Sequence, residues 1–316
     1  MLWNSISAVL TAFVFLAIGF LITRAGWITK DNKNLLTMLV MYIAVPCTIF
    51  KNVLDTVSPD NISSIWGYIL VPALSILTVF FLSGILARHV LKVQKGRLGA
   101  FSCMCSCSNT IFVGLPIVLS AIGDVSVPYV MYYLMAQNVI FWSLGLIGIQ
   151  RDGQGDIHFS FGDMVKKVLS INIVVIFISL LLVALRVTVP VFFMDIAGKL
   201  GNTCTPLSLI FCGATMYEVF QNHGLRGLAI PRDTLYVFIS RFVICPLLMF
   251  GICTLFGIGG IARTVFVIIS AMPTQSQTVI MSSRYGADVD FASITFFWTT
   301  LACFVVIPIL LTIVAG

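Results

Sequence analysis

Charged side chains are scarce in this chain, and their scarcity excludes an ordinary soluble domain. Only 9% of the 316 residues are Asp, Glu, Lys or Arg, while 59% are hydrophobic. Soluble domains carry about a quarter charged residues, so little of this surface is expected to face water. Apolar runs of roughly 20 residues match the thickness of the hydrocarbon core of a bilayer. Ten such runs are present, at 6–23, 35–53, 66–87, 98–122, 127–149, 168–187, 203–220, 234–256, 263–283 and 290–314.

Constellations typical of enzymes and metal sites are also missing. The chain has three histidines, all in loops or at the ends of runs, and no His–Glu pairing for zinc. No glycine-rich phosphate loop follows a strand. The nine cysteines lie within or at the edges of apolar runs, where thiols behave as small hydrophobes. We therefore predict that the chain is not an enzyme and has no catalytic residue, metal site or cofactor.

Lysine and arginine are concentrated in alternate loops. When the nine loops between the runs are numbered in order, the odd loops hold 13 of the 18 basic residues and the even loops hold four. Short loops rich in Lys and Arg stay in the cytoplasm. The pattern predicts a multi-pass protein of the cell (inner or plasma) membrane with both termini extracytoplasmic. It also accounts for the net charge of +6 without a nucleic-acid partner.

A polar stretch at 151–163 divides the chain into two halves of five runs each. We assign 1–150 to a first five-helix repeat, 151–167 to a cytoplasmic connecting loop, and 168–316 to a second repeat. An odd number of spans per half forces the halves into opposite orientations, which is the geometry of an inverted repeat.

Prolines at matching places support this division. Pro46 and Pro206 lie in the second run of each half, and Pro116 and Pro273 lie in the fourth. The predicted fold class is an all-α polytopic membrane protein of ten transmembrane helices. These form two inverted five-helix repeats, with proline-broken crossover helices as the fourth and ninth.

The two broken helices carry the polar residues that best fit a solute site. Proline removes a backbone hydrogen bond inside a helix, and in hydrocarbon the freed groups need protein, water or solute partners. A corresponding pair of broken helices indicates a transporter site near the bilayer midplane. The N-terminus of each second half-helix suits an anion such as a carboxylate. The candidate substrate-binding residues here are Ser108, Asn109, Thr110, Gly114, Pro116, Pro273, Thr274, Gln275, Ser276 and Gln277. The alternative is a pair of kinks whose freed groups are bound by neighbouring Ser and Thr.

Two adjacent carboxamides, Gln137 and Asn138, lie in the middle of the fifth run. Burying them is costly unless they are partnered. They either line the solute pocket or form hydrogen bonds between helices. Because adjacent helical residues point about 100° apart, one can face the solute while the other braces a helix.

Arg241 is the one basic residue well inside a run. Intramembrane charges are functional candidates by default. Glu218, at the cytoplasmic end of the preceding run, is a possible partner for it. The pair is expected either to be structural or to serve as a gate or as a contact for a substrate carboxylate.

Three blocks of sequence resemble the auxin efflux carrier family, in its bacterial branch. They are Asn109–Pro116, Gln137–Asn138 before Trp142, and Ala271–Thr274 followed by Arg284–Asp288. The resemblance implies a ten-helix fold of two inverted five-helix repeats, with helices that cross at Pro116 and Pro273. It also implies a homodimer whose scaffold contains the first two helices of each repeat, beside a transport domain that moves like an elevator. Asn109, Gln137 and Asn138 would lie near the solute.

These observations favour a secondary transporter of small organic anions, meaning mono- or dicarboxylates such as malate, malonate or auxin-like acids. Its expected partners are the anion, the lipid bilayer and a second copy of the chain. Coupling to Na⁺ or H⁺ and uniport all stay open. A sodium-coupled symporter of bile-acid type is the alternative within transport, although no acidic sodium ligand lies mid-span. A membrane sensor or an intramembrane enzyme is the alternative of another class.

Overall fold

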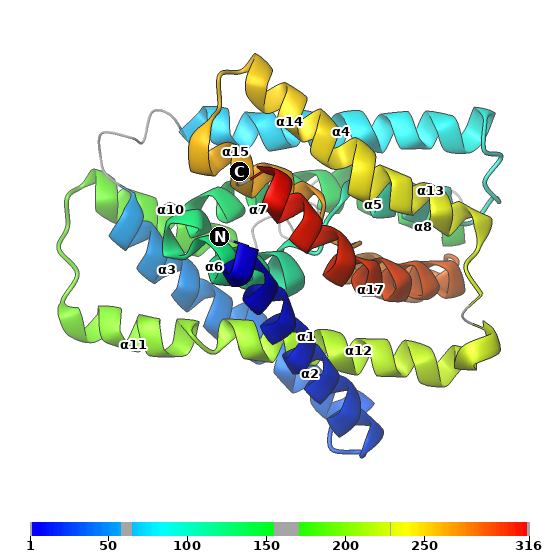
Figure 1. The fold of residues 1–316 in the computed structure, drawn as a ribbon, viewed down its shortest axis with the longest axis horizontal. Helices are drawn as coiled ribbons and strands as arrows, with labels where there is room; N and C mark the ends of the chain where they lie inside the picture. The colour runs from blue at the N-terminus through cyan, green and yellow to red at the C-terminus, as the bar shows by residue number, and fades with distance from the viewer. Residues whose placement is uncertain (1, 58–64, 155–170, 228, 315–316) are drawn as a thin grey trace.

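Helices fill almost all of the chain that the computed structural model describes, which is residues 2–57, 65–154, 171–227 and 229–314 (Figure 1). In these ranges an isolated bridge between Ser108 and Thr274 is the only β-type pairing. The helices, with π- and 3₁₀-helical segments written η, are α1 (Leu2–Arg24), α2 (Lys30–Leu39), η1 (Val40–Ala44), α3 (Val45–Thr56), α4 (Ile65–His89), α5 (Leu98–Ser106), η3 (Thr110–Gly114), α6 (Leu115–Ile122), η4 (Asp124–Ser126), α7 (Val127–Ile140), η5 (Phe141–Gly145), α8 (Leu146–Gln154), α10 (Ile171–Ala184), α11 (Val191–Gly201), α12 (Cys204–Gly227), α13 (Arg232–Ile239), η6 (Ser240–Ile244), α14 (Cys245–Leu255), α15 (Gly260–Ser270), α16 (Ser276–Tyr285) and α17 (Val289–Val314). The prediction of an all-α membrane protein is confirmed.

Five continuous helical stretches in the described residues are long and apolar enough to cross a membrane. They are Asn32–Asp55, Ile65–His89, Asp124–Gly153, Arg232–Leu255 and Val289–Ile313. Four shorter apolar helices accompany them, at Phe13–Arg24, Thr110–Ile122, Val174–Ala184 and Gly260–Ser270. The connecting loop that we predicted at 151–167 lies largely outside the described residues.

Three of the π-helical turns are followed by a proline. The turns η1, η3 and η6 run directly into α3, α6 and α14, whose first turns contain Pro46, Pro116 and Pro246. Proline lacks an N–H group and crowds the carbonyl one turn before it, so the chain widens there. The helix therefore continues through Pro116, and our prediction of a break at that proline is corrected. The interruption lies earlier, at Cys107–Asn109, whereas Pro273 does lie inside its own interruption between α15 and α16.

The helices form two packed groups. In one, α1 crosses α12, and α3 packs against α10 and α11 (Figure 1). In the other, α4 packs against α5 and α7, α14 against α15, and α16 against α8 and α17. The backbones of α1 and α12 touch where they cross, because a Cβ built on Gly213 would lie 2.0 Å from the carbonyl oxygen of Leu16. The segments η3 and α7 pack against α12 and α3, so the two groups share a boundary.

Candidate functional site

The two helix interruptions cross each other. The first separates α5 from η3, and the second separates α15 from α16. At the crossing, the N–H of Asn109 donates to the carbonyl of Pro273 at 2.8 Å, and Ser108 pairs with Thr274 as an antiparallel bridge. Two segments about 165 residues apart in sequence thus form hydrogen bonds with some of the backbone groups that the interruptions leave without a helical partner.

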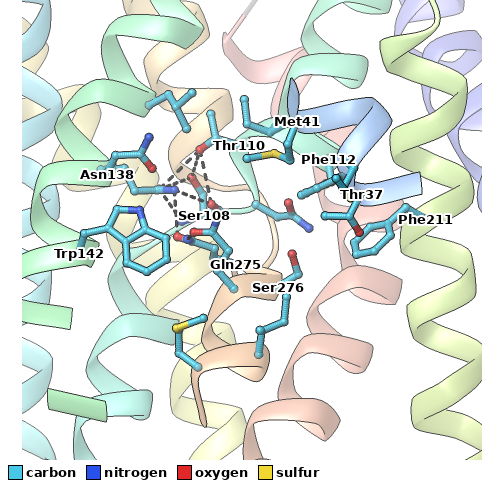
Figure 2. A pocket seen from close by; sticks show the side chains of 18 of the residues that line it. Thr37, Met41, Ser108, Thr110, Phe112, Asn138, Trp142, Phe211, Gln275 and Ser276 are labelled. Carbon is cyan, nitrogen blue, oxygen red and sulfur yellow. Dashed lines mark hydrogen bonds between the residues drawn. The ribbon is translucent and has the colours of Figure 1, made fainter. Parts of the chain in front are cut away.

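The carboxamide of Gln137 holds the first interruption in place. Its Nε2 donates to the Ser108 carbonyl at 2.8 Å, and its Oε1 accepts from the Ser108 N–H at 2.8 Å (Figure 2). Nε2 also donates to Oε1 of Gln275 at 3.1 Å, which reaches the second interruption. A side chain of α7 therefore pairs with the open backbone as a neighbouring strand would.

A cavity of about 780 Å³ lies beside this crossing. It is bounded by both interruptions, by α7 and by residues of α2 and α12. The lining consists of Asn34, Thr37, Met38, Met41, Tyr42, Ser108, Asn109, Thr110, Ile111, Phe112, Leu134, Gln137, Asn138, Trp142, Ile171, Phe211, Gln275, Ser276, Gln277, Ile280, Met281 and Arg284. Eight of the twelve residues predicted to bind substrate are in this set.

The other four predicted residues lie behind the lining. Thr274 hydrogen-bonds Thr299 of α17 at 3.0 Å, and the Pro273 carbonyl is taken by the crossing itself. Gly114 lets α15 approach, because a Cβ at this position would lie 2.8 Å from Cδ1 of Ile269. Pro116 is buried in the first turn of α6. These residues shape the crossing and do not face the cavity.

Two helix N-termini begin at the cavity wall. They belong to η3, which continues into α6, and to α16. Neither N-cap residue, Asn109 nor Gln275, makes a side-chain capping bond. First-turn amides have no partner within their own helix, and the dipole gives each end a partial positive charge. The first-turn residues Phe112, Ser276 and Gln277 line the cavity, so these ends are placed to receive an anion.

Asn138 faces the cavity without a partner. The residue is 7% exposed, and no hydrogen bond joins its side chain to the rest of the described chain. Figure 2 shows Asn138 and Trp142 on one side of the cavity, with Thr37 and Phe211 on the other. The carboxamide is open to the cavity and is not among the fully buried polar atoms that lack a partner, so its donors and acceptor are available to a polar group of a bound solute.

Sequence reasoning missed the wall formed by α2 and α12. Asn34 and Thr37 lie one turn apart on α2, and the ring of Phe211 packs at a tilt of 31° against Phe112 with ring centroids 4.7 Å apart. The one available signal was the helical spacing of the two polar residues at the start of the second run. Phe211 is indistinguishable by sequence from any other apolar residue of its run.

Arg241 is fully buried and binds the C-terminal ends of both interrupted helices. Its Nε and Nη2 donate to the carbonyl of Met272 at 2.9 and 2.7 Å, and Nη2 also donates to that of Ser270 at 2.7 Å. Nη1 donates to the carbonyls of Ser106 at 3.0 Å and Cys105 at 3.5 Å. The guanidinium therefore neutralises carbonyl groups that the interruptions leave open.

Glu218 does not pair with Arg241, and that prediction is corrected. Glu218 forms an ion pair with Lys33 of α2. The Lys33 ammonium also lies 5.5 Å from the ring centroid of Phe211, at the edge of the cavity. The N–H groups of Arg241 already donate to backbone carbonyls, so the carboxylate of Glu218 pairs with Lys33 instead.

Comparisons with known proteins place the chain in a family. Residues 4–311 match the family model described as "Membrane transport protein". An uncharacterized transporter of Methanocaldococcus jannaschii is 24% identical over 302 residues, covering 95% of this chain and 96% of that protein. An uncharacterized transporter of Methanothermobacter thermautotrophicus is 22% identical over 312 residues, covering 97% of each. The chain therefore belongs to the membrane transport protein family, the family of the auxin efflux carriers that its motifs resemble, and is a multi-pass membrane protein.

Proposed function

We propose that this protein is a secondary transporter of small organic anions, with a mono- or dicarboxylate bound in the cavity beside the crossing. One observation carries the proposal: two helix N-termini without side-chain caps converge on a cavity with Asn138, which has no partner among the described residues, and none of the described lining residues is Asp or Glu. Helix N-termini bind carboxylates well, and no acidic side chain in the described part of the lining opposes that preference.

The proposed transporter crosses the membrane ten times as two inverted five-helix repeats, 1–150 and 168–316. Contacts between loops support alternating sides. Arg97, in an odd loop, pairs with Asp233 at 3.1 Å and Asp288 at 2.8 Å, both at odd loops. Among even loops, a Cβ on Gly198 would lie 3.1 Å from Cε of Lys51. No described ion pair joins an odd loop to an even one.

The proposed mechanism is an elevator movement of one helix group past the other. The scaffold is α1–α3 with α10–α12, and the transport domain is α4–α8 with α13–α17. The position of the cavity supports this division, because Thr37 and Phe211 come from the scaffold whereas Asn138 and Gln275 come from the transport domain. We extend the proposal to a homodimer held through the scaffold, as in the family that the chain resembles.

The cavity reaches the side on which the odd loops gather. Asn34 and Arg284, which lie next to odd loops, are part of its lining. With Lys- and Arg-rich loops in the cytoplasm, both termini lie outside and the cavity opens inward.

Thermal stability of the purified protein tests the function directly. Malate, malonate, indole-acetate and cholate are added singly, with and without sodium. We expect malate, malonate or indole-acetate to raise the melting temperature without sodium, because a ligand that binds only the folded state stabilises it. Stabilisation by cholate alone, and only with sodium, would contradict the proposal and favour the bile-acid-type symporter. No stabilisation by any of the four would also contradict it.

Replacing Asn109 with Ala is expected to abolish uptake while leaving expression intact. Asn109 is 2% exposed, lines the cavity and stands at the start of η3. Its only side-chain hydrogen bond in the described structure is a long one, 3.9 Å, to Sγ of Cys212, so little stability depends on it. Uptake into proteoliposomes is compared with that of Asn202→Ala, an exposed asparagine at the C-terminal end of α11. Normal uptake by Asn109→Ala would remove this residue from the site.

Replacing Arg284 with Gln is expected to slow anion binding several-fold at low salt. Arg284 is the one charged residue among the described residues of the cavity lining, and Asp288, four residues later, is already paired with Arg97. An unpaired cation at a cavity mouth steers anions inward, and salt screens that attraction. Stopped-flow association rates are measured from about 0.01 M to about 1 M salt. The control is Arg263→Gln, whose side chain lies on Phe250 away from the cavity. An equal salt response in the two variants would contradict the prediction.

A further inference from the structure

Three carboxamides form a hydrogen-bonded chain along the wall of the cavity. Nε2 of Gln137 on α7 donates to Oε1 of Gln275 at 3.1 Å, and Nε2 of Gln275 donates to Oε1 of Gln277. Gln275 is the N-cap residue of α16, and Gln277 lies in the first turn of that helix. All three residues line the cavity. The chain therefore runs from α7 to the first turn of α16, beside the space proposed to hold the solute.

The backbone of Ser108 fixes the direction of this chain. Its N–H can only donate and its carbonyl can only accept, and both bond to Gln137 at 2.8 Å. The Ser108 hydroxyl also donates to Oε1 of Gln137, at 3.0 Å. A carboxamide accepts at its oxygen and donates at its nitrogen. A reversed Gln137 would place donor against donor and acceptor against acceptor inside the protein, so only one orientation is compatible with Ser108.

The orientation of Gln137 determines that of Gln277. Because Gln137 donates, Gln275 turns its oxygen towards Gln137 and its nitrogen towards Gln277. Gln275 is 6% exposed, so little water reaches its carboxamide. Gln277 accepts from Gln275 through Oε1, and no described residue accepts a hydrogen bond from its Nε2. The end of the chain therefore presents N–H donors to the cavity.

The cavity offers little to a positively charged group of a solute. None of its described lining residues is Asp or Glu, and Arg284 is the charged one among them. An ammonium group has three N–H donors and no acceptor. Beside Gln277 those donors would meet donors, and burying a charge without partners is costly. A hydroxyl or carbonyl oxygen at the same place accepts from Gln277 instead.

We infer that Gln277 is a specificity-determining residue, which favours acids with an oxygen acceptor beside the carboxylate over amino acids of the same shape. Gln277 stands in the first turn of α16, one of the two ends proposed to hold the carboxylate, so its donors lie next to that group. Gln137 and Gln275 are positioning residues that fix which side of Gln277 the solute meets. The inference rests on the proposed function and narrows its substrate class.

Two matched pairs of solutes test this selection on the full-length purified protein. Malate and aspartate share a carbon skeleton and both carboxylates, and differ by a hydroxyl against an ammonium group. Indole-lactate and tryptophan differ in the same way. We expect at least one of the two hydroxy acids to bind, and to bind at least about tenfold more tightly than its amino acid, because the ammonium leaves buried donors unpaired.

Two variants test the carboxamide chain. Gln277→Glu places an acceptor at its end, so the preference for the hydroxy acid is expected to fall at least about tenfold or to reverse. Gln275→Met leaves Gln277 in place but free to turn, and is expected to lower the same ratio of affinities about tenfold. The control is Gln221→Met, an exposed glutamine of α12 outside the cavity. An equal loss of affinity for both members of a pair in Gln275→Met would show that Gln275 only supports the fold, and would overturn its positioning role.

The unaltered protein decides the matter even if neither variant folds. An amino acid that binds as tightly as its hydroxy acid would overturn the inference and leave the anion transporter standing. Binding of malonate or indole-acetate without binding of either hydroxy acid would have the same consequence. Failure of all these acids to bind would reject the transporter proposal as well.

Discussion

Gln137→Leu is expected to lower the melting temperature by roughly 5 °C or more, while Asn138→Leu leaves it nearly unchanged. The two carboxamides are adjacent and both buried, but only Gln137 pairs with backbone. Its loss leaves the N–H and the carbonyl of Ser108 unsatisfied inside the protein. Each buried unsatisfied group costs about 1–3 kcal/mol.

Solute affinity is expected to be lowered selectively by the other substitution, Asn138→Leu. Asn138→Leu removes the one buried carboxamide in the lining that has no partner among the described residues, so solute affinity falls while the fold is retained. Melting curves in detergent, with and without malonate or indole-acetate, measure both effects on the same samples. Equal destabilisation by the two substitutions would contradict the roles assigned here to the two residues.

Gly213→Ala is expected to be the most damaging single-methyl change in the scaffold. The new Cβ would lie 2.0 Å from the carbonyl oxygen of Leu16 and 2.8 Å from the N atom of Phe20. Both are backbone atoms, so α1 and α12 must separate. Overpacking costs about 1–3 kcal/mol when side chains can adjust, and this crossing offers no such adjustment. We expect little folded protein and, in what remains, weakened solute binding, because Phe211 of the cavity lies two residues away on α12.

The matched control for this change is Gly251→Ala on α14. That glycine is helical, and nothing lies within 4 Å of the position its Cβ would take. Alanine is there expected to be neutral or stabilising by up to about 1 kcal/mol. Size-exclusion profiles and melting curves compare the two. Folded yield from Gly213→Ala equal to that from Gly251→Ala would contradict the close crossing of α1 and α12.

The parts of the fold that depend on local chemistry were predictable from sequence. Hydropathy indicated the helices, and Pro273 indicated an interruption that does contain it. The break predicted at Pro116 lies seven to nine residues earlier, at Cys107–Asn109. The π-helical turn before Pro116 accommodates the hydrogen bond that proline cannot make, so the helix continues through it. A π-helical turn changes neither the composition nor the hydrophobic periodicity of a segment, so the position of the first interruption could not be predicted from sequence.

The site was predictable only where its residues lie in the interruptions or beside them. Gln137 and Asn138 were identified by their polarity. In the structure both line the cavity, and only Gln137 also hydrogen-bonds the backbone of the first interruption. The partner predicted for Glu218 was wrong, because the observed partner, Lys33, lies 185 residues away in sequence. The ligands of Arg241 are backbone carbonyls, which every residue possesses, so no side-chain pattern pointed to them.

The position of a bound carboxylate is the most direct test of the solute site. The measurement is a structure of the full-length protein with malonate or indole-acetate, whichever raises the melting temperature more. We expect the carboxylate about 3 Å from a first-turn amide of η3 or α16 and within reach of the Asn138 carboxamide. A carboxylate found outside the cavity, or in direct contact with Arg241, would contradict binding at the two helix N-termini.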